Sequence, residues 1–308
     1  MEIALQFVLL ALGFVMLGKG ADWFVEGAAG IAMRFGIPQL VIGLTIVAMG
    51  TSAPEAAVSI AAAVKGNADI TIGNILGSNI LNILVILGLA ASIVPIAVAR
   101  STVRIEIPFM IGVTALLFYQ GRDGSISLAD GGVLMVAFAV YMMYLYTMAM
   151  KSNVDSDLEE PGLPLGRCLL GAVGGLALII AGSNVTVGAA TSIATYAGLS
   201  ERFIGLTIVA LGTSLPELFT SVAAARRGNA DIAIGNIVGS NIFNILFVVG
   251  LSSLIIDIPF ASAFNFDTYV ALGAAVLLLL CVLRTQRLQR WAGALMLVCY
   301  AAYLGYIL

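Results

Sequence analysis

Two short polar motifs occur twice in this chain and decide how it folds. The first copy reads Gly50-Thr51-Ser52-Ala53-Pro54-Glu55 and Gly77-Ser78-Asn79-Ile80-Leu81-Asn82, and the second reads Gly212-Thr213-Ser214-Leu215-Pro216-Glu217 and Gly239-Ser240-Asn241-Ile242-Phe243-Asn244. Each residue lies 162 positions from its partner, and residues 41–90 match residues 203–252 at 34 of 50 positions. Each copy places a carboxylate, hydroxyls and amides inside an apolar segment, where polar groups need a partner or a ligand.

The composition is that of a polytopic membrane protein. Of 308 residues, 61% are hydrophobic and only 10% are charged, and several apolar runs reach the roughly 20 residues that a membrane helix needs. These runs are continuous, which favours helices over a β-barrel. The scattered Lys and Arg residues give no indication of nucleic-acid binding. The sequence has no His, so the commonest transition-metal ligand and the usual general base are missing.

Ten membrane spans are predicted, which makes this an all-α protein. They are 3–34, 38–64, 69–94, 102–119 and 128–150 in the first half, and 166–197, 200–225, 231–256, 267–283 and 290–307 in the second. An acidic connector, 151–165, separates a first five-helix repeat (1–150) from a second (166–308). Because five is odd, the second repeat enters the membrane from the opposite side. Such inverted repeats with broken central helices are the architecture of many secondary transporters.

The basic residues predict the orientation of the chain. Ten fall on one side of the membrane: Arg34, Arg100, Arg104, Lys151, Arg167, Arg226, Arg227, Arg284, Arg287 and Arg290. Three fall on the other: Lys65, Arg122 and Arg202. Since cytoplasmic loops carry the excess of Lys and Arg, both termini are expected outside and the connector in the cytoplasm.

The repeated prolines predict breaks in the second and seventh spans, because proline cannot donate to the carbonyl four residues earlier. The carbonyls freed around Ala48 to Thr51 need a partner that lipid cannot supply. Thr51, Glu55 and Ser59 share one helix face, with Ser52 beside them. The seventh span repeats this arrangement with Thr213, Ser214, Glu217 and Ser221.

The third and eighth spans carry matching polar stripes. These consist of Asn74, Ser78 and Asn82 in one and Asn236, Ser240 and Asn244 in the other. Glycines four residues apart, Gly73 and Gly77 or Gly235 and Gly239, permit close helix contact. All four stripes are expected to meet near mid-membrane. Their ligand set is all oxygen, which hard cations such as Ca²⁺ and Na⁺ prefer.

Charge and burial separate the glutamates from the other polar residues. An ionised Glu in a membrane costs about 3 kcal/mol on insertion scales, so Glu55 and Glu217 together require compensation. One Ca²⁺ neutralises both, and several Na⁺ competing for the same oxygens would do so too. Ser59, Ser221, Asn74 and Asn236 remain open between helix packing and ligation. Asp22 is expected to pair with Lys19 or to lie in the membrane interface, and Glu106 to pair with nearby Arg residues.

These motifs resemble the α-repeats of the sodium/calcium exchangers, within the calcium/cation antiporter superfamily, and most closely those of prokaryotic antiporters. The resemblance covers essentially the whole chain. It implies ten helices around four central ion sites that hold one Ca²⁺ or about three Na⁺, and a location in a bacterial inner membrane. It also implies metal-ligand roles for Glu55, Glu217, Thr51, Thr213, Ser52, Ser214, Ser78, Ser240 and Asn82, with carbonyl donors at Ala48 and Ala210.

One position departs from part of that family. Some archaeal and potassium-dependent relatives carry Asp where this chain has Asn244, which argues against potassium co-transport and leaves open whether the middle site holds water or Na⁺.

The resulting hypothesis is antiport, with Na⁺ entry driving Ca²⁺ export by a monomer that needs no cofactor. A Ca²⁺/H⁺ antiporter is the alternative, followed by a passive channel or a non-transporting sensor. An enzyme is not expected, since no nucleophile–base pair or cofactor motif is evident.

Overall fold

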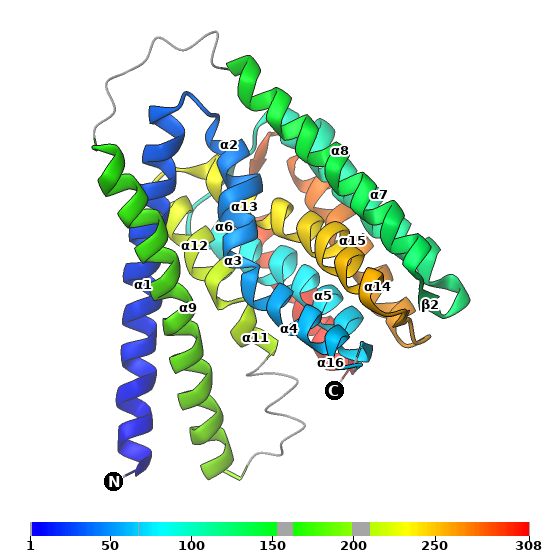
Figure 1. The fold of residues 1–308 in the computed structure, drawn as a ribbon. Coiled ribbons are helices and arrows are strands. Elements are labelled where there is room, and N and C mark those ends of the chain that lie inside the picture. The colour runs from blue at the N-terminus through cyan, green and yellow to red at the C-terminus, as the bar shows by residue number, and fades with distance from the viewer. Residues whose placement is uncertain (1, 67, 153–162, 199–209, 308) are drawn as a thin grey trace.

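Long helices form almost the whole of the chain (Figure 1), in a computed structural model that describes residues 2–66, 68–152, 163–198 and 210–307. The elements of the first half are α1 (Glu2–Arg34), α2 (Gln39–Ile42), η1 (Gly43–Val47), α3 (Ala48–Thr51), α4 (Ala53–Val64), α5 (Asp69–Leu81), η2 (Asn82–Leu87), α6 (Gly88–Ile93), β1 (Ile96–Ala97), η3 (Thr102–Glu106), α7 (Ile107–Gln120), η4 (Gly121–Asp123), β2 (Ser125–Ile126) and α8 (Leu128–Ser152). Those of the second half are α9 (Leu165–Tyr196), α11 (Ala210–Thr213), α12 (Leu215–Arg226), α13 (Ala230–Phe243), η6 (Asn244–Val249), α14 (Gly250–Ile255), β3 (Ile258–Pro259), α15 (Phe264–Val282), β4 (Arg287–Leu288) and α16 (Arg290–Ile307).

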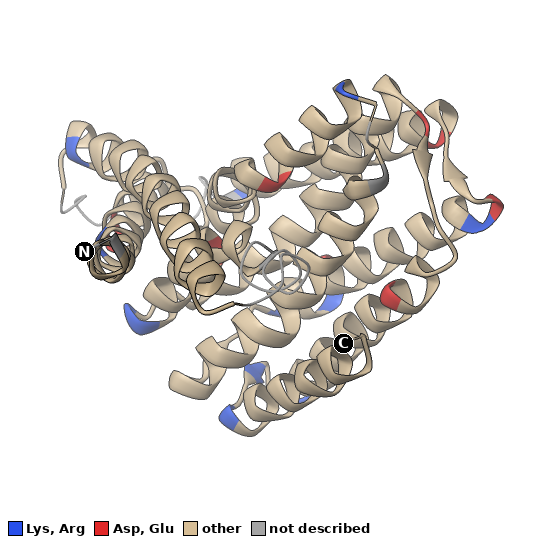
Figure 2. Cartoon of the chain, turned by 90° about the horizontal axis from the view of Figure 1, so that it is seen from below, with Lys and Arg blue, Asp and Glu red and all other residues tan. Residues whose placement is uncertain are grey.

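The helices confirm that this is a membrane protein. Among the described residues, eight helices are long and apolar enough to cross a membrane, and a ninth span arises if the bent pair Gln39–Thr51 and Ala53–Val64 is one crossing. Charged residues are sparse along these helices (Figure 2). The predicted seventh span, 200–225, and the connector, 151–165, lie partly outside the described residues.

Burial separates central helices from peripheral ones. In the most apolar stretch of Ala230–Ile255, 94% of the residues are buried, and in Ile70–Ile93 78% are, against 17% in Ile3–Phe35. The peripheral α1 instead exposes large apolar side chains such as Phe7 and Val8. A helix that is apolar all round belongs in the interior, whereas an apolar outward face suits lipid. The helices that carry the polar stripes are therefore the central ones.

The two longest helices, α1 and α9, lie side by side at the edge of the molecule (Figure 1). Glycines bring their backbones together. A Cβ atom on Gly20 would lie 2.9 Å from the carbonyl oxygen of Gly175, and one on Gly175 would lie 2.7 Å from the carbonyl oxygen of Gly20. Only residues without a side chain permit this approach, as in other close helix pairs in membranes.

A second close contact joins the two halves in the interior. A Cβ atom on Gly235 of α13 would lie 3.1 Å from the Cα of Gly43, and one on Gly239 would lie 2.8 Å from the Cα of Leu44. The predicted role in close packing is confirmed for this glycine pair but is wrong for Gly77, where a Cβ atom would meet nothing within 4 Å. The contact places α13 directly against the segment that leads to the break after Thr51.

Two short antiparallel strand pairs also cross between the halves. Ile96 pairs with Leu288, and Ile126 pairs with Ile258. The sequence analysis did not predict strands, since two-residue pairs leave no periodic pattern. A shift of 162 residues converts β1 into β3 and β2 into β4, so the two pairs are equivalent under the sequence repeat.

We predict that Gly239→Val destabilises the protein by about 1–3 kcal/mol, because the added methyl groups overpack a contact between α13 and η1. Thermal unfolding in detergent measures the effect. Gly112→Val is the matched control, since a Cβ atom there meets nothing within 4 Å. Equal melting temperatures for the two variants would contradict the close contact.

Candidate cation site

The two repeated prolines lie at breaks between short helical segments. α3 ends at Thr51, Ser52 has a non-helical backbone (φ −82°, ψ 7°), and α4 begins at Ala53 with Pro54 in its first turn. The first break bends the chain by 51°. Ser214 has the same conformation (φ −90°, ψ 4°) between α11 and α12. Proline is favoured at a helix start because its missing N–H is not needed there.

Glu55 and Glu217 lie in the first turns of α4 and α12 and are fully buried. A carboxylate at this position benefits from the positive end of the helix dipole. Each glutamate also accepts a hydrogen bond from the break in the other half: Ser52 Oγ donates to Glu217 Oε1 over 2.8 Å, and Ser214 Oγ to Glu55 Oε1 over 3.3 Å. The two carboxylates are thus parts of one cluster, as the sequence predicted.

Ser78 extends this cluster from the central helix α5. Its hydroxyl lies 3.3 Å from Glu55 Oε1 and 3.2 Å from Ser214 Oγ. Ser240, the equivalent residue on α13, instead donates to the carbonyl oxygen of Ala48 over 3.3 Å. The carbonyl of Ala48, at the start of α3, therefore faces the polar cluster.

The threonines lie at the ends of the segments before each break. Thr51 Oγ1 is buried, 3.0 Å from both the carbonyl oxygen of Val47 and the side-chain oxygen of Asn236. Thr213 ends α11 and is half-buried. Ala210 begins α11, and its side chain lies outside what the structure describes.

Four asparagines form a reciprocal amide cluster where α5 and α13 cross. Asn79 Nδ2 donates to the carbonyl oxygen of Asn241, and Asn241 Nδ2 donates to that of Asn79, both over 3.2 Å. Asn82 Nδ2 donates to Asn241 Oδ1 over 2.9 Å, and Asn244 Nδ2 to Asn79 Oδ1 over 3.1 Å. Asn79 and Asn241 were not among the predicted ligands. Their recurrence in both Gly-Ser-Asn motifs was the available signal.

Asn82 and Asn244 each begin a π-helical segment, Asn82–Leu87 and Asn244–Val249. Single π turns inside α-helices occur frequently at functional sites, because the extra residue changes where side chains point. The Asn82 N–H still bonds the Ser78 carbonyl, so the α-helical spacing of these two residues is kept, and the π turn changes the direction of the residues after Asn82.

The residues left open between packing and ligation make helix-packing hydrogen bonds. Asn74 Nδ2 donates to Ser59 Oγ over 2.9 Å and to the Glu55 carbonyl over 3.3 Å. Asn236 Nδ2 donates to Ser221 Oγ over 2.9 Å and to the Glu217 carbonyl over 3.4 Å. Each asparagine thereby fixes the helix that carries a glutamate.

Both the carboxylate cluster and the amide cluster contain buried oxygens that no donor reaches. Glu55 Oε2, Glu217 Oε2, Asn82 Oδ1 and Asn244 Oδ1 are buried without a hydrogen-bond partner among the described residues. Within the same residues, the ion pairs join Arg227 to Asp22 and Glu26 and not to these oxygens, and no three His, Cys, Asp or Glu side chains gather together. Buried acceptors without a donor are costly, so the arrangement suits a positively charged ligand held by oxygen atoms.

Residues 5–147 and 168–308 match the family described as "Sodium/calcium exchanger protein". The chain belongs to this family. Its sequence is 33% identical over 350 residues to the sodium/calcium exchanger MaX1 of Methanosarcina acetivorans, with 98% of both chains covered. It is 39% identical over 305 residues to the inner membrane protein YrbG of Escherichia coli, covering 94% of this chain and 92% of that one.

A solved structure of the sodium-calcium exchanger NCX_Mj has the same fold. It superimposes with a TM-score of 0.86 at 34% identity, over 98% of this chain and 99% of that chain.

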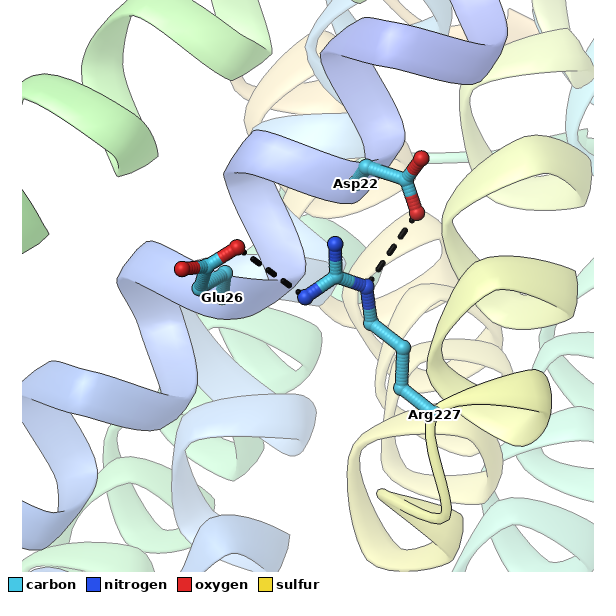
Figure 3. A network of polar contacts seen from close by, with 3 residues as sticks. All are labelled: Asp22, Glu26 and Arg227. Atoms are coloured by element: carbon cyan, nitrogen blue, oxygen red, sulfur yellow. Dashed lines mark hydrogen bonds and ion pairs between the residues drawn. The ribbon is translucent and has the colours of Figure 1, made fainter.

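Two charged residues of this exchanger-family protein have other partners than expected. Arg227, at the end of α12, joins Asp22 and Glu26 of α1 at 3.1 Å each (Figure 3). The expectation that Asp22 pairs with Lys19 is therefore wrong, whereas its alternative location in the membrane interface stays a prediction. Lys19 and Asp22 are three residues apart on one helix, but Arg227 approaches Asp22 from the packed neighbour.

Glu106 was expected to pair with Arg residues, and this is also wrong. Glu106 is buried, and Tyr144 of α8 donates a hydrogen bond to its Oε1. Arg104 is exposed two residues away, which places it on a different side of the helix.

We predict that Asn79→Ala and Asn241→Ala lower stability by similar amounts, about 1–3 kcal/mol for each buried group left unpaired. Each variant removes one Nδ2 donor from the backbone carbonyl of the other asparagine and one Oδ1 acceptor from Asn82 or Asn244, so the two losses should match. Melting temperatures of the purified variants measure this. A loss in only one of the two variants would contradict the reciprocal arrangement.

Proposed function

We propose that this protein is a secondary active antiporter that exchanges Na⁺ for Ca²⁺ by alternating access, with Na⁺ entry driving Ca²⁺ export. The observation that carries the proposal is the set of buried, unpartnered oxygens on Glu55, Glu217, Asn82 and Asn244. Membership of the exchanger family and the likeness to MaX1 and NCX_Mj support it. The transported ions are substrates, no cofactor is required, and the protein acts as a transporter and not as an enzyme.

The proposed ligands combine the two glutamates with neutral oxygens. Glu55 and Glu217 supply two negative charges, which one Ca²⁺ neutralises. Ser52, Ser214, Ser78, Ser240, Thr51 and Thr213 supply hydroxyls, Asn82 and Asn244 amide oxygens, and Ala48 and Ala210 carbonyls. Oxygen ligands of this kind suit both Ca²⁺ and Na⁺. Because both ions need the same carboxylates, they bind as competitors, and competition at one site couples their fluxes.

The proposed architecture is ten helices in two inverted repeats, residues 1–150 and 166–308, joined by the connector 151–165. Support comes from contacts that recur at the 162-residue offset: the crossed strand pairs, the reciprocal Asn79 and Asn241 bonds, and the paired π segments. Since both halves contribute to one cluster, a monomer contains a whole site.

The bias of basic residues puts both termini outside and the connector in the cytoplasm, and the inner-membrane relative YrbG favours a bacterial inner membrane.

Proton coupling is the second candidate. Protons would satisfy the two unpartnered carboxylate oxygens as directly as a metal ion would. A Ca²⁺/H⁺ antiporter would therefore use the same Glu55 and Glu217. The four unpartnered oxygens favour the Na⁺/Ca²⁺ assignment, because the two amide oxygens accept metal ions but are not protonated at neutral pH.

The deciding experiment uses purified protein in liposomes and radioactive Ca²⁺. An imposed Na⁺ gradient is expected to drive Ca²⁺ accumulation, with little movement under a pH gradient alone. Ca²⁺ accumulation under a pH gradient alone would replace Na⁺ coupling by H⁺ coupling. Ca²⁺ leakage down its own gradient without any counter-ion would indicate a channel.

We predict that Glu55→Gln and Glu217→Gln each reduce exchange about 100-fold or more. Removing one charge of a buried ionic site costs about 3–5 kcal/mol, and each 1.4 kcal/mol is a factor of about ten. Glu106→Gln is the matched control, because Glu106 is another buried carboxyl bonded to Tyr144. Retained exchange in either site variant would remove that glutamate from the ligand set.

We also predict that Asn244→Asp changes ion preference. The substitution raises the negative charge of the site from two to three, so one Ca²⁺ no longer neutralises it and a further monovalent cation or proton is needed. Ca²⁺ uptake measured against external Na⁺, K⁺ and pH should show a new dependence. An unchanged profile would place Asn244 outside the site.

A further inference from the structure

One backbone carbonyl beside the candidate cation site receives a hydrogen bond from outside its own helix. Helical geometry would pair the Gly212 carbonyl with the N–H of residue 216, but residue 216 is proline and has none. Ser183, a buried residue of α9, instead donates its hydroxyl to that carbonyl over 2.7 Å. An unpaired carbonyl at membrane depth is costly, so Ser183 stabilises the broken conformation.

The first half lacks this donor. Pro54 frees the Gly50 carbonyl in the same way, yet the residue 162 positions before Ser183 is Ala21, whose methyl side chain cannot donate. Ala21 in α1 and Ser183 in α9 are both buried. The two breaks therefore differ: the hydroxyl of Ser183 bonds the freed carbonyl at the second break, and the equivalent position at the first break has no hydroxyl.

Gly212 directly precedes two of the proposed ligands. Thr213 follows it, and Ser214 then donates to Glu55 Oε1 over 3.3 Å and lies 3.2 Å from Ser78 Oγ. The hydrogen bond from Ser183 holds the peptide at residue 212, which limits how far these hydroxyls can turn. α9 also packs closely on α1 through Gly175 and Gly20, so Ser183 links this peptide to the peripheral helix pair.

We propose that Ser183 is a positioning residue for the second-half part of the cation site. Its hydroxyl holds the Gly212 carbonyl and thereby the orientation of Thr213 and Ser214, and it makes ion binding depend on where α9 lies. This inference rests on the proposed function, because it assumes that the cluster around Glu55 binds transported cations.

The first test compares Ser183→Ala with Ser183→Thr, which keeps a hydroxyl, and with Ser192→Ala. Ser192 is also on α9, but it is exposed and bonds the Gly188 carbonyl of its own helix over 2.9 Å. In liposomes, Ser183→Ala is expected to raise the KM for Ca²⁺ about 3- to 10-fold, the equivalent of one hydrogen bond, with Ser183→Thr near wild type and Ser192→Ala unchanged. A lower melting temperature with an unchanged KM would reduce Ser183 to a packing role and overturn the proposal.

The second test asks whether Ser183 acts through the missing N–H. Pro216→Ala restores a donor to the Gly212 carbonyl, so Ser183→Ala should have little further effect in that background. The readout is the rise in melting temperature that Ca²⁺ alone produces in purified protein, which needs no transport. Equal effects of Ser183→Ala in both backgrounds would overturn the proposal. If wild type binds Ca²⁺ but does not exchange it for Na⁺, the proposed function fails while this cycle still decides the role of Ser183.

Discussion

The structure depends on the burial of two carboxylates that no cationic side chain of the described chain neutralises. Glu55 and Glu217 are fully buried, and the neighbouring groups that reach them are hydroxyls. An uncompensated charge in a membrane is expensive. The helices around the pair stabilise the carboxylates in part, through hydrogen bonds from neutral hydroxyl groups. Both glutamates begin a helix, where the dipole favours negative charge. A bound cation or proton, as proposed above, would supply the remaining stabilisation, and the stability of the protein would then depend on ion binding.

The contacts between the halves explain why the site cannot form from one half alone. Ser52 serves Glu217, Ser214 serves Glu55, and Ser240 reaches the Ala48 carbonyl. The amide cluster around Asn79 and Asn241 holds the central helices in register with one another. These bonds use the side-chain donors and leave four buried oxygens without a hydrogen-bond partner among the described residues, on Glu55, Glu217, Asn82 and Asn244. The arrangement separates residues that fix the helices from the residues proposed above as ligands.

The sequence predicted those parts of the site that depend on local chemistry. Proline at 54 and 216 specified the breaks, and an apolar background made the two glutamates conspicuous. The identity of cross-half partners could not be predicted, because Ser52 reaches Glu217 only through the packing of two segments 165 residues apart. Asn79 was missed since a lone asparagine is compatible with packing anywhere on a helix. Asp22 and Glu106 were given the wrong partners because sequence distance favoured Lys19 and the nearby Arg residues, whereas Arg227 and Tyr144 come from neighbouring helices.

The ion pair between Arg227 and α1 also makes the two halves energetically unequal. The positions related by the repeat are Lys65, Asn184 and Gly188, which offer no carboxylate to the lysine. A carrier built from two halves would have equally populated inward-open and outward-open forms only if every contact had a counterpart. An exposed ion pair contributes about 0–1 kcal/mol, enough to shift such an equilibrium up to about fivefold. The ion gradients still determine the direction of net transport. The ion pair instead changes the fraction of ion-free protein that is open to each side of the membrane.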